Sequence, residues 1–407
     1  MEDEISRSKI LFVAEAVTLA HVGRPLALAA SLDRQTYEID FACASGYEFC
    51  YRNSGLRHWP LDSVSSTRFL QALAAGKPVY DEATLRAYVE DDLRLLDQLR
   101  PHLVVGDFRL SLSVSARLAG IPYTALTNAY WSPHVDQHYR VPDLPLTKFL
   151  PIAIADVLFG LIRPLAFARH ARPLNGVRAH YGLPPLGPDL RRIYTDADYT
   201  LYADLAALFP ARRLPPHHHY IGPVLWSPPL PLPPWWWQVP DDRPIIYVTL
   251  GSSGQGRLLP PVLRALAPLP LTVLLATAGN TVAGPLPANV HAAAFLPGEA
   301  AARRASLVIC NGGSPTSQQA LAAGVPLIGI AGNLDQFLNM HGVVTAGAGT
   351  LLRADRLSVA ALQAAITHLL EDRSARAAAK NIAAAFLQHD AGANFNALMP
   401  RMLAAAA

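Results

Sequence analysis

The spacing of apolar residues in the amino half of the chain predicts an α/β domain. Short, largely apolar runs occur at residues 10–16, 37–44, 102–107 and 121–126. Runs of this kind are typical of strands buried on both faces of a parallel sheet. After the first run, apolar residues recur at helical spacing over residues 26–32. The order strand, helix, strand therefore predicts a doubly wound sheet.

A proline-rich segment interrupts this pattern near the middle of the chain. Seven prolines between Pro228 and Pro244 exclude an interior strand or a regular helix, and Trp235, Trp236 and Trp237 lie among them. We interpret the segment as a stiff linker. Beyond it a second series of apolar runs begins at Pro244, which predicts a second doubly wound α/β domain.

These patterns divide the chain into four parts. We predict a first domain, a linker, a second domain and a carboxyl-terminal helix that packs back on the body, over residues 1–225, 226–243, 244–385 and 386–407. Two doubly wound domains in tandem are expected to face each other across a cleft. Ligands of such sheets bind outside the carboxyl ends of the strands.

Composition and charge exclude several classes of protein. The chain of 407 residues is 51% hydrophobic and 16% charged, so it is not intrinsically disordered. Its net charge of +3 is too small and too dispersed to indicate a nucleic-acid partner. Residues 243–407 hold 11 basic and 6 acidic side chains, and this excess fits an anionic ligand in the carboxyl half.

The cysteines and the amino terminus favour a cytoplasmic protein. Cys43, Cys50 and Cys310 have neither the spacing of a zinc site nor that of a disulfide framework. The polar amino terminus lacks the features of a signal peptide. The most apolar stretch, residues 149–162, is shorter than the roughly 20 residues of a spanning helix. It could still lie on a membrane surface.

The segment from Cys310 to Met340 has the features of an anion site. An apolar strand ends at Asn311, two glycines allow close approach of a ligand, and Ser314 with Pro315 suits an N-cap and a first helical position. The backbone N–H groups and hydroxyls of such a helix start can bind a diphosphate. The alternative is an ordinary capped helix.

A second glycine loop follows the first strand of the predicted carboxyl domain. Residues 251–257, GSSGQGR, match neither the phosphate loop of nucleoside triphosphatases nor the dinucleotide-binding fingerprint. ATP and NAD are therefore not indicated. The loop can still donate N–H and O–H groups to phosphate.

Together these segments carry a family resemblance. The run NGGSPTSQQALAAGVPLIGIAGNLDQFLN resembles the nucleotide-sugar signature of family 1 glycosyltransferases, which include UDP-glycosyltransferases and bacterial macrolide glycosyltransferases. The matching positions are Gly312, Gly313, Ser317, Ala320, Leu321, Gly324, Val325, Pro326, Asp335, Gln336 and Asn339. The resemblance implies a GT-B fold, in which an acceptor-binding amino domain and a donor-binding carboxyl domain are both Rossmann-like. It implies a nucleotide-diphosphate sugar as co-substrate and no further cofactor.

The same resemblance implies a set of donor-binding residues. The nucleotide base would stack near Phe295 and bond to the backbone at Leu296, and Asp335 with Gln336 would hold sugar hydroxyls. A loop Asp that caps the following helix is the alternative for the last pair. The remaining donor residues, which would surround the phosphates and the ribose, are Gly251, Ser252, Asn311, Gly313, Ser314, Thr316, Ser317 and Gln319.

Two of these positions depart from the usual family pattern. Asn311 stands where the family has a phosphate-binding His, and Gln319 where it has a Glu that grips the ribose. A neutral amide holds a diol less firmly than a carboxylate does. A deoxyribose donor such as a dTDP-sugar therefore rivals a UDP-sugar, and the choice stays open.

The resemblance also places a catalytic pair in the amino domain. His21 takes the position of the family's catalytic base, and Asp107, at the end of a predicted strand, matches its carboxylate partner. An imidazole can accept a proton from a hydroxyl at neutral pH, and a carboxylate can orient it. For a His and an Asp far apart in a sequence, structural roles are the alternative.

The sequence does not indicate a metal site. Asp196 and Asp198 have the spacing of a metal-binding carboxylate pair but lie in the acceptor half. The side chains of His217, His218 and His219 are adjacent and point apart, which disfavours a shared ion. Without a metal, the helix start at Ser314 would stabilise the departing diphosphate during displacement with inversion.

The acceptor is expected to be hydrophobic. Tyr130, Trp131 and Tyr139 precede the apolar segment 149–167, and together these residues occupy the region where the family binds its acceptor. The segment could line an acceptor site, rest on a membrane surface or form a core helix.

We therefore predict an inverting, metal-independent glycosyltransferase that moves a hexose or deoxyhexose from a UDP- or dTDP-sugar to a hydroxyl of a hydrophobic acceptor. Two alternatives remain, a lipid-linked or cell-wall sugar transferase of a related GT-B family and a catalytically silent nucleotide-sugar-binding protein. The sequence leaves the oligomeric state and any peripheral membrane contact open.

Overall fold

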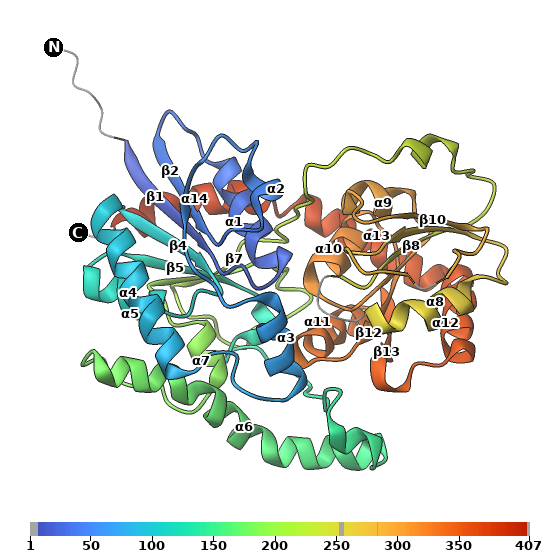
Figure 1. Cartoon of the computed structure of the whole chain (residues 1–407), viewed down its shortest axis with the longest axis horizontal. Helices are drawn as coiled ribbons and strands as arrows, with labels where there is room; N and C mark the ends of the chain where they lie inside the picture. The colour runs from blue at the N-terminus through green and yellow to red at the C-terminus, as the bar shows by residue number, and fades with distance from the viewer. Residues whose placement is uncertain (1–6, 252–255, 283, 405–407) are drawn as a thin grey trace. The chain divides into compact units, whose positions relative to one another are not determined.

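The computed structural model describes residues 7–251, 256–282 and 284–404 (Figure 1). Its described residues form two compact units. The first consists of the described residues within Met1–Asp136, Ile162–Val224 and His389–Ala407, and the second of those within Gln137–Leu161 and Leu225–Gln388. Each unit contains one parallel sheet, which confirms the prediction of two parallel-sheet α/β domains.

The first unit is built on a seven-stranded sheet in the order β3-β2-β1-β4-β5-β6-β7, and every paired neighbour is parallel. Its strands are β1 (Ser8–Ala14), β2 (Tyr37–Cys43), β3 (Arg57–Pro60), β4 (Leu103–Asp107), β5 (Tyr123–Thr127), β6 (Tyr199–Tyr202) and β7 (His218–Tyr220). The strand order changes direction between β1 and β4. In open parallel sheets this switch point is where ligands bind.

Helices cover this sheet and connect its strands. They are α1 (Leu19–Ser31), α2 (Glu48–Tyr51), α3 (Ser66–Ala74), α4 (Glu82–Leu99), α5 (Leu112–Ala119), α7 (Leu190–Tyr194) and α14 (Ala391–Ala404), with a 3-10 turn at Ala129–Trp131. The last helix packs against α1, where Phe395 is fully buried with its ring 6.0 Å from that of Phe12. Helix α14 is therefore part of the first unit's core.

The second unit is built on a six-stranded sheet in the order β10-β9-β8-β11-β12-β13, again parallel throughout. Its strands are β8 (Ile245–Thr249), β9 (Thr272–Ala276), β10 (Val290–Ala293), β11 (Leu307–Cys310), β12 (Leu327–Ala331) and β13 (Gly349–Arg353). Strands β8, β9, β11 and β12 are buried throughout, as their continuous apolar runs predict.

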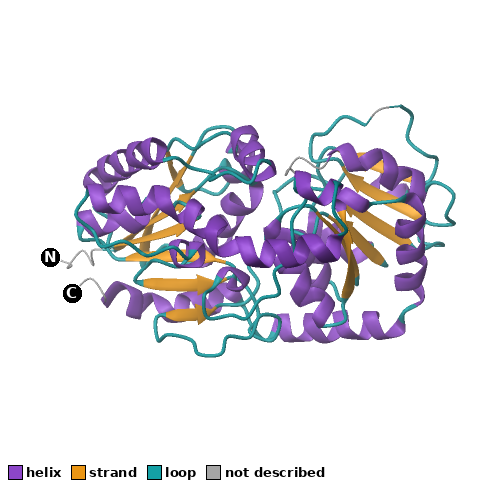
Figure 2. Cartoon of the chain, turned by 90° about the horizontal axis from the view of Figure 1, so that it is seen from below, coloured by secondary structure: helices purple, strands orange, loops and turns teal. Residues whose placement is uncertain are grey.

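Figure 2 shows the helices of the second unit packed around this sheet. They are α8 (Leu259–Leu266), α9 (Gly298–Arg304), α10 (Ser314–Ala322), α11 (Leu334–Thr345), α12 (Val359–Glu371) and α13 (Arg373–Leu387), with 3-10 turns at Pro145–Lys148, Gly256–Leu258 and Ala354–Arg356. Parallel pairing brings the carboxyl ends of β8, β11 and β12 to one edge of the sheet.

The proline and tryptophan segment docks on the second unit. It contains a 3-10 turn at Pro234–Gln238, and Trp236 is buried while Trp237 is exposed. The guanidinium of Arg304 lies 5.2 Å from the centre of the Trp236 ring and donates to the carbonyl oxygens of Trp236 and Val239. These contacts hold the segment in place although its prolines prevent regular structure.

Residues 137–161 lie within the range predicted for the first domain, but they pack on the second unit. Arg353 donates to the carbonyl oxygen of Val141 at 2.7 Å, and the Thr147 hydroxyl donates to Asp355, also at 2.7 Å. The division between the units falls inside the long helix α6 (Ile152–His180), between residues 161 and 162 (Figure 1). No helix in the described part of the chain is both long and apolar enough to cross a bilayer.

Candidate functional site

A His and Asp pair lies at the switch point of the first sheet. His21 belongs to the first turn of α1, which follows β1, and Asp107 is the last residue of the neighbouring strand β4. His21 Nδ1 lies 2.8 Å from Asp107 Oδ1. Because a carboxylate accepts hydrogen bonds, this contact places the proton on Nδ1 and leaves Nε2 as the basic nitrogen. The structure brings the two predicted catalytic residues together.

Arg24, which the sequence analysis did not single out, completes this pair. Its Nε donates to Asp107 Oδ2 and its Nη2 to Oδ1, both at 2.8 Å, and Nη2 also lies 3.2 Å from His21 Nδ1. Burial would lower the pKa of Arg24, but Asp107 raises it above its ordinary value. The sequence contained one signal for this role: Arg24 follows His21 by three residues, and residues three apart on a helix share a face.

The polar network extends along the carboxyl edge of the first sheet. Arg24 Nη1 donates to Asn128 Oδ1 at 2.6 Å, and Asn128 Nδ2 donates to both carboxylate oxygens of Asp204. Asn128 follows β5 and Asp204 follows β6. Three neighbouring strand ends therefore fix the guanidinium that holds Asp107.

A row of aromatic rings begins at His21. The His21 ring stacks on Phe108, whose φ of +61° turns the backbone sharply after Asp107. The Phe108 ring lies 5.5 Å from that of Tyr194, Tyr194 lies 5.1 Å from Trp131, and Trp131 lies 6.4 Å from Phe167. Phe108 stacks on the imidazole, and the following rings are tilted or perpendicular to one another, so they form an aromatic cluster beside His21.

A buried ionic cluster stabilises the loop that follows β4 and contains Phe108 and Arg109. Arg109 follows Phe108 and donates to Glu15 at 3.0 Å and to Asp92 at 3.0 Å, with all three side chains almost fully buried. Burial raises the pKa of Glu15 against the opposing effect of Arg109. Removing one partner from such a cluster leaves an uncompensated buried charge, so the cluster fixes the loop that carries Asp107.

In the second unit the predicted anion loop joins β11 to α10. Asn311 Oδ1 accepts from the Gly313 N–H at 3.0 Å, and Gly312 has a φ of +79°. The N-cap of α10 is Gly313 rather than Ser314, so Ser314 and Pro315 are its first two helical residues. The N-cap prediction was wrong by one residue, because Gly313 is still extended and the helix begins after it.

Asn339, a position of the family motif, and Ser317, a predicted donor-binding residue, hold this loop together. Asn339 Nδ2 donates to the carbonyl oxygen of Gly312 and to the Ser317 hydroxyl, each at 2.8 Å. The Ser317 hydroxyl donates in turn to the carbonyl oxygens of Gly313 and Ser314. Asn339 lies in α11, so these bonds fasten the start of α10 to the neighbouring helix.

The start of α11 is capped by Asn333. Its side chain accepts from the Gln336 N–H at 3.0 Å, and Gln336 Oε1 accepts from the Gly332 and Asn333 N–H groups at 2.8 and 3.2 Å. Asp335, half-buried in the first helical turn, is not the capping residue. The amide oxygen predicted to contact sugar is therefore already bound to the backbone.

Gln319 binds the linker. Its Nε2 donates to the carbonyl oxygen of Trp226 at 2.8 Å and to the Ser227 hydroxyl at 3.2 Å. A carboxylate at this position could not donate to that carbonyl and would face it with negative charge. The amide in place of the family's Glu thus has a structural reason.

The remaining predicted donor residues lie at the same edge of the second sheet. Gly251 follows β8 with a φ of +68°, and a Cβ there would approach Asn311 Nδ2 to 2.8 Å. Phe295 and Leu296 follow β10, Phe295 half-buried and Leu296 buried. Thr316 is half-buried in the first turn of α10. Ser252 lies outside the described residues.

The acidic pair and the central His of the triplet, His218, have structural partners. Asp196 pairs with Arg117 and Arg178, and Asp198 accepts from the Tyr123 N–H. His218 is buried with its Nδ1 2.6 Å from the Tyr202 hydroxyl. Within the described residues, no group of three or more His, Cys, Asp or Glu side chains could hold a metal ion.

Known glycosyltransferases are similar to this protein over almost the whole chain. The family profile described as "Erythromycin biosynthesis protein CIII-like, C-terminal domain" matches residues 279–394. A "PGL/p-HBAD biosynthesis glycosyltransferase" of Mycobacterium tuberculosis is 52% identical over 380 residues, 93% of this chain and 89% of that protein. A "PGL/p-HBAD biosynthesis rhamnosyltransferase" of Mycobacterium bovis is 53% identical over 380 residues, 93% and 84% of the two chains.

A third relative is named as inactive. This "Inactive PGL/p-HBAD biosynthesis glycosyltransferase" of Mycobacterium bovis is 51% identical over 260 residues, which cover 64% of this chain and 71% of that protein. Its match is thus less extensive than those of the two relatives named as transferases.

Solved structures share the fold at low sequence identity. The spinosyn forosaminyltransferase SpnP aligns with a TM-score of 0.70 and 19% identity over 98% of this chain and 100% of its own. The glycosyltransferase VinC, solved in complex with dTDP, aligns with a TM-score of 0.69 and 19% identity over 97% and 99% of the two chains. The described fold is therefore that of the GT-B glycosyltransferases.

Proposed function

Because the chain belongs to the family 1 glycosyltransferases, we propose that it transfers a hexose or deoxyhexose with inversion from a dTDP- or UDP-sugar to a hydroxyl of a hydrophobic, aromatic acceptor. The observation that carries the catalytic part of this proposal is the His21–Asp107 contact at the switch point of the first sheet. Nucleotide-sugar transfer is the activity of the family, while the mechanism and the acceptor are our proposal.

In the proposed reaction His21 Nε2 takes the proton of the acceptor hydroxyl. The oxygen then attacks the anomeric carbon as the bond from that carbon to the diphosphate oxygen breaks, which inverts the configuration. Asp107 keeps the other proton on Nδ1 and stabilises the imidazolium once it forms. Arg24 acts as a positioning residue, because its two bonds fix the plane of the Asp107 carboxylate.

We assign the diphosphate to the start of α10. The residues that would meet it are Gly313, Ser314 and Thr316. The N–H groups of Ser314 and Thr316 lie at the positive end of the helix dipole, while the Gly313 N–H donates to Asn311. As negative charge develops on the leaving group, this end stabilises it, so the reaction is expected to need no metal. Ser317 and Asn339 hold the loop in shape, since their polar atoms bind each other and Gly312.

A dTDP-deoxyhexose is the donor we favour. One relative at 53% identity is named a rhamnosyltransferase, and rhamnose is a deoxyhexose. VinC, which has the same fold, was solved with dTDP. Gln319, in place of the Glu that grips a ribose diol, uses its amide to bind Trp226. A donor without the ribose 2′-hydroxyl has less need of a carboxylate there.

The acceptor we propose is lipophilic and contains an aromatic ring. The rings of Phe108, Tyr194 and Trp131 continue from the His21 imidazole and offer stacking surface. The two transferase relatives act in PGL/p-HBAD biosynthesis according to their names, and a related acceptor fits this surface. We propose that the protein acts in the cytoplasm with peripheral contact to a membrane.

The experiment that tests the proposal is product analysis with His21→Ala as the variant. Purified protein is incubated with dTDP- and UDP-sugars and a set of phenolic acceptors, and the products are identified by mass spectrometry and by the anomeric configuration of the new bond. We expect His21→Ala to reduce kcat by about 10³-fold with dTDP binding unchanged. Undiminished turnover in this variant, or a product with retained configuration, contradicts the mechanism.

A further inference from the structure

The first half of α6 presents an apolar face to solvent. Among the described residues thirteen large hydrophobic side chains are exposed, and seven of them lie between residues 149 and 165. They are Phe149, Ile154, Val157, Leu158, Leu161, Ile162 and Leu165, with exposed fractions from 38% to 84%. We call the six of them that belong to the helix the α6 stripe.

The α6 stripe occupies one side of the helix. Its members follow one another at steps of three, one, three, one and three residues, which is the spacing of a single helical face. The opposite side is the one that packs on protein, because Ala155 and Phe159 are buried in a cluster with Val141. Asp156 accepts from the Val141 N–H at 2.7 Å. The stripe therefore lies outside the packed core and still lacks a partner in the described chain.

Cations continue the same face beyond the stripe. Arg169 and Arg172 follow Leu165 by four and seven residues, so they lie on its side of the helix. Both are exposed, and within the described residues neither forms a hydrogen bond or an ion pair. Asp156 is the one acidic residue between positions 144 and 188. This stretch of sequence thus combines an apolar face with positive charge.

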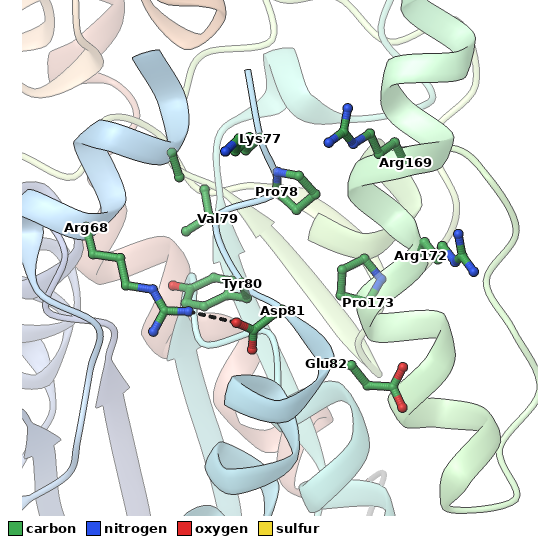
Figure 3. A pocket seen from close by; sticks show the side chains of 11 residues that line it. Arg68, Lys77, Pro78, Val79, Tyr80, Asp81, Glu82, Arg169, Arg172 and Pro173 are labelled. Atoms are coloured by element: carbon green, nitrogen blue, oxygen red, sulfur yellow. Dashed lines mark hydrogen bonds and ion pairs between the residues drawn. The ribbon is translucent and has the colours of Figure 1, made fainter. Parts of the chain in front are cut away.

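Arg169 and Arg172 line a cavity of about 370 Å³ together with exposed Lys77 (Figure 3). Arg68 lines the same cavity, but its guanidinium is engaged by Asp81 at 3.1 Å. The ammonium group of Lys77, like the guanidinium groups of the two arginines, has no hydrogen-bond or ion-pair partner within the part of the chain that the structure describes. Apart from the Arg68–Asp81 pair, three cations and one carboxylate, that of Glu82, line the cavity. The cavity therefore has a net positive charge next to an apolar helical face.

We propose that α6 docks this protein on an anionic membrane surface, with the α6 stripe among the acyl chains and Lys77, Arg169 and Arg172 at the lipid phosphates. A bilayer supplies both the apolar phase and the negative charge that this helix lacks. A second copy of the chain would bring a helix of the same charge. The inference deepens the proposed function, on which it rests for its biological use, because a lipophilic acceptor resides in such a membrane.

Vesicle binding tests the role of the stripe. The full chain is sedimented with vesicles of phosphatidylcholine alone and of phosphatidylcholine with phosphatidylglycerol. We expect binding to the anionic vesicles, and a loss of affinity of at least about tenfold in the double variant Leu161→Ser, Leu165→Ser. The matched control replaces two exposed leucines elsewhere, Leu118→Ser and Leu387→Ser, and is expected to bind as the unmodified protein does.

The same assay tests the cations. The double variant Arg169→Gln, Arg172→Gln is expected to lose about tenfold in affinity for the anionic vesicles and to depend less on salt. Its control is Arg94→Gln, Arg100→Gln, which removes two exposed arginines of α4 and its carboxyl end. Equal loss in the control would overturn a specific role for the α6 cations.

Two further outcomes overturn the proposal. One is the absence of binding to either kind of vesicle by the unmodified protein. The other is a dimer in sedimentation velocity that the Leu161→Ser, Leu165→Ser variant dissociates, because a second copy would then cover the stripe. Transfer to a soluble short-chain acceptor is measured in parallel. Transfer without vesicle binding refutes the docking surface alone, and vesicle binding without transfer refutes the proposed function alone.

Discussion

The loops at the strand ends of the two units differ in their polar side chains, which are mainly charged in the first unit and neutral in the second. In the first unit, buried charges lie in direct contact, and Asp107 is held by His21 and Arg24. In the second, the loop around Gly313 is built from amides, hydroxyls and backbone groups, among them Asn311 and Asn339. A base that moves a proton needs a compensating charge close by, whereas a diphosphate can be bound by helix dipoles and N–H groups. The sheets are alike, and the side chains at their edges differ.

Among the substitutions that test this comparison, loss of Arg24 is expected to have the largest effect on stability and on kcat. Arg24→Gln leaves the carboxylate of Asp107 buried with one fewer cation, which costs about 3 kcal/mol of the free energy of unfolding. We expect kcat to fall by about 10²-fold and the pH profile of kcat to shift, because Arg24 Nη2 lies 3.2 Å from the imidazole. Urea denaturation and pH-dependent kinetics measure the two effects.

Arg24→Lys separates charge from geometry. A lysine retains the positive charge but cannot make the bidentate contact with Asp107. Stability is therefore expected to recover more than kcat does. If stability and kcat recovered equally in Arg24→Lys, or if neither variant changed the pH profile, Arg24 would have a structural role only.

Loss of Asn339 tests the neutral loop of the second unit. Asn339→Ala removes the donors to the Gly312 carbonyl and the Ser317 hydroxyl, at a cost of about 2 kcal/mol. Because the start of α10 loses its support, we expect dTDP to bind more weakly while kcat at saturation changes less. Calorimetric titration with dTDP measures the affinity. A change in kcat without a change in dTDP affinity would contradict the assignment of nucleotide binding to the strand-end loops of the second unit and of catalysis to those of the first.

His218 provides a pH test away from both loops. Burial, followed by the nearby charges of His217, His134 and His219, lowers the pKa of His218 to about 3. Between this value and the ordinary pKa of about 6.5, the unfolded chain binds a proton that the folded chain excludes. Stability should therefore decline as the pH falls from 7 to 5, by about 2 kcal/mol from this residue.

His218→Gln isolates that contribution, because an amide can bond to Tyr202 without titrating. Between pH 7 and pH 5 the free energy of unfolding of the unmodified protein, measured by denaturation at several pH values, should fall by about 2 kcal/mol relative to that of the variant. A constant difference across this range would show that His218 is not the titrating group.

Gln319→Glu is expected to have the smallest effect. The carboxylate would face the Trp226 carbonyl that now accepts a bond from the amide, so we expect about 1 kcal/mol of destabilisation. If the nucleotide ribose lies near this residue, UDP affinity should rise relative to dTDP affinity. Thermal-shift titrations with UDP and dTDP compare the two ligands, and an unchanged preference would separate Gln319 from the ribose.

Several elements could be predicted from the sequence because their signals are local. Strands β1, β4, β8 and β11 are buried on both faces, and a continuous apolar run is enough to identify them. Strands β3, β6 and β7 have four residues or fewer, with His, Arg or Tyr among them, and they gave no such signal. Their pairing depends on neighbours far away in the chain.

The sequence by itself determined the two parallel sheets, the position of Asp107 at a strand end and that of His21 in the segment after the first strand, since these follow from hydrophobic periodicity and from motifs within single segments. Tertiary structure alone decided that Arg24 would share Asp107 with His21, and that Gln319 would bind the linker. It also decided that α6 would leave an apolar face exposed. These outcomes depend on which surfaces remain after the sheets and helices pack, and that is a property of contacts between distant residues.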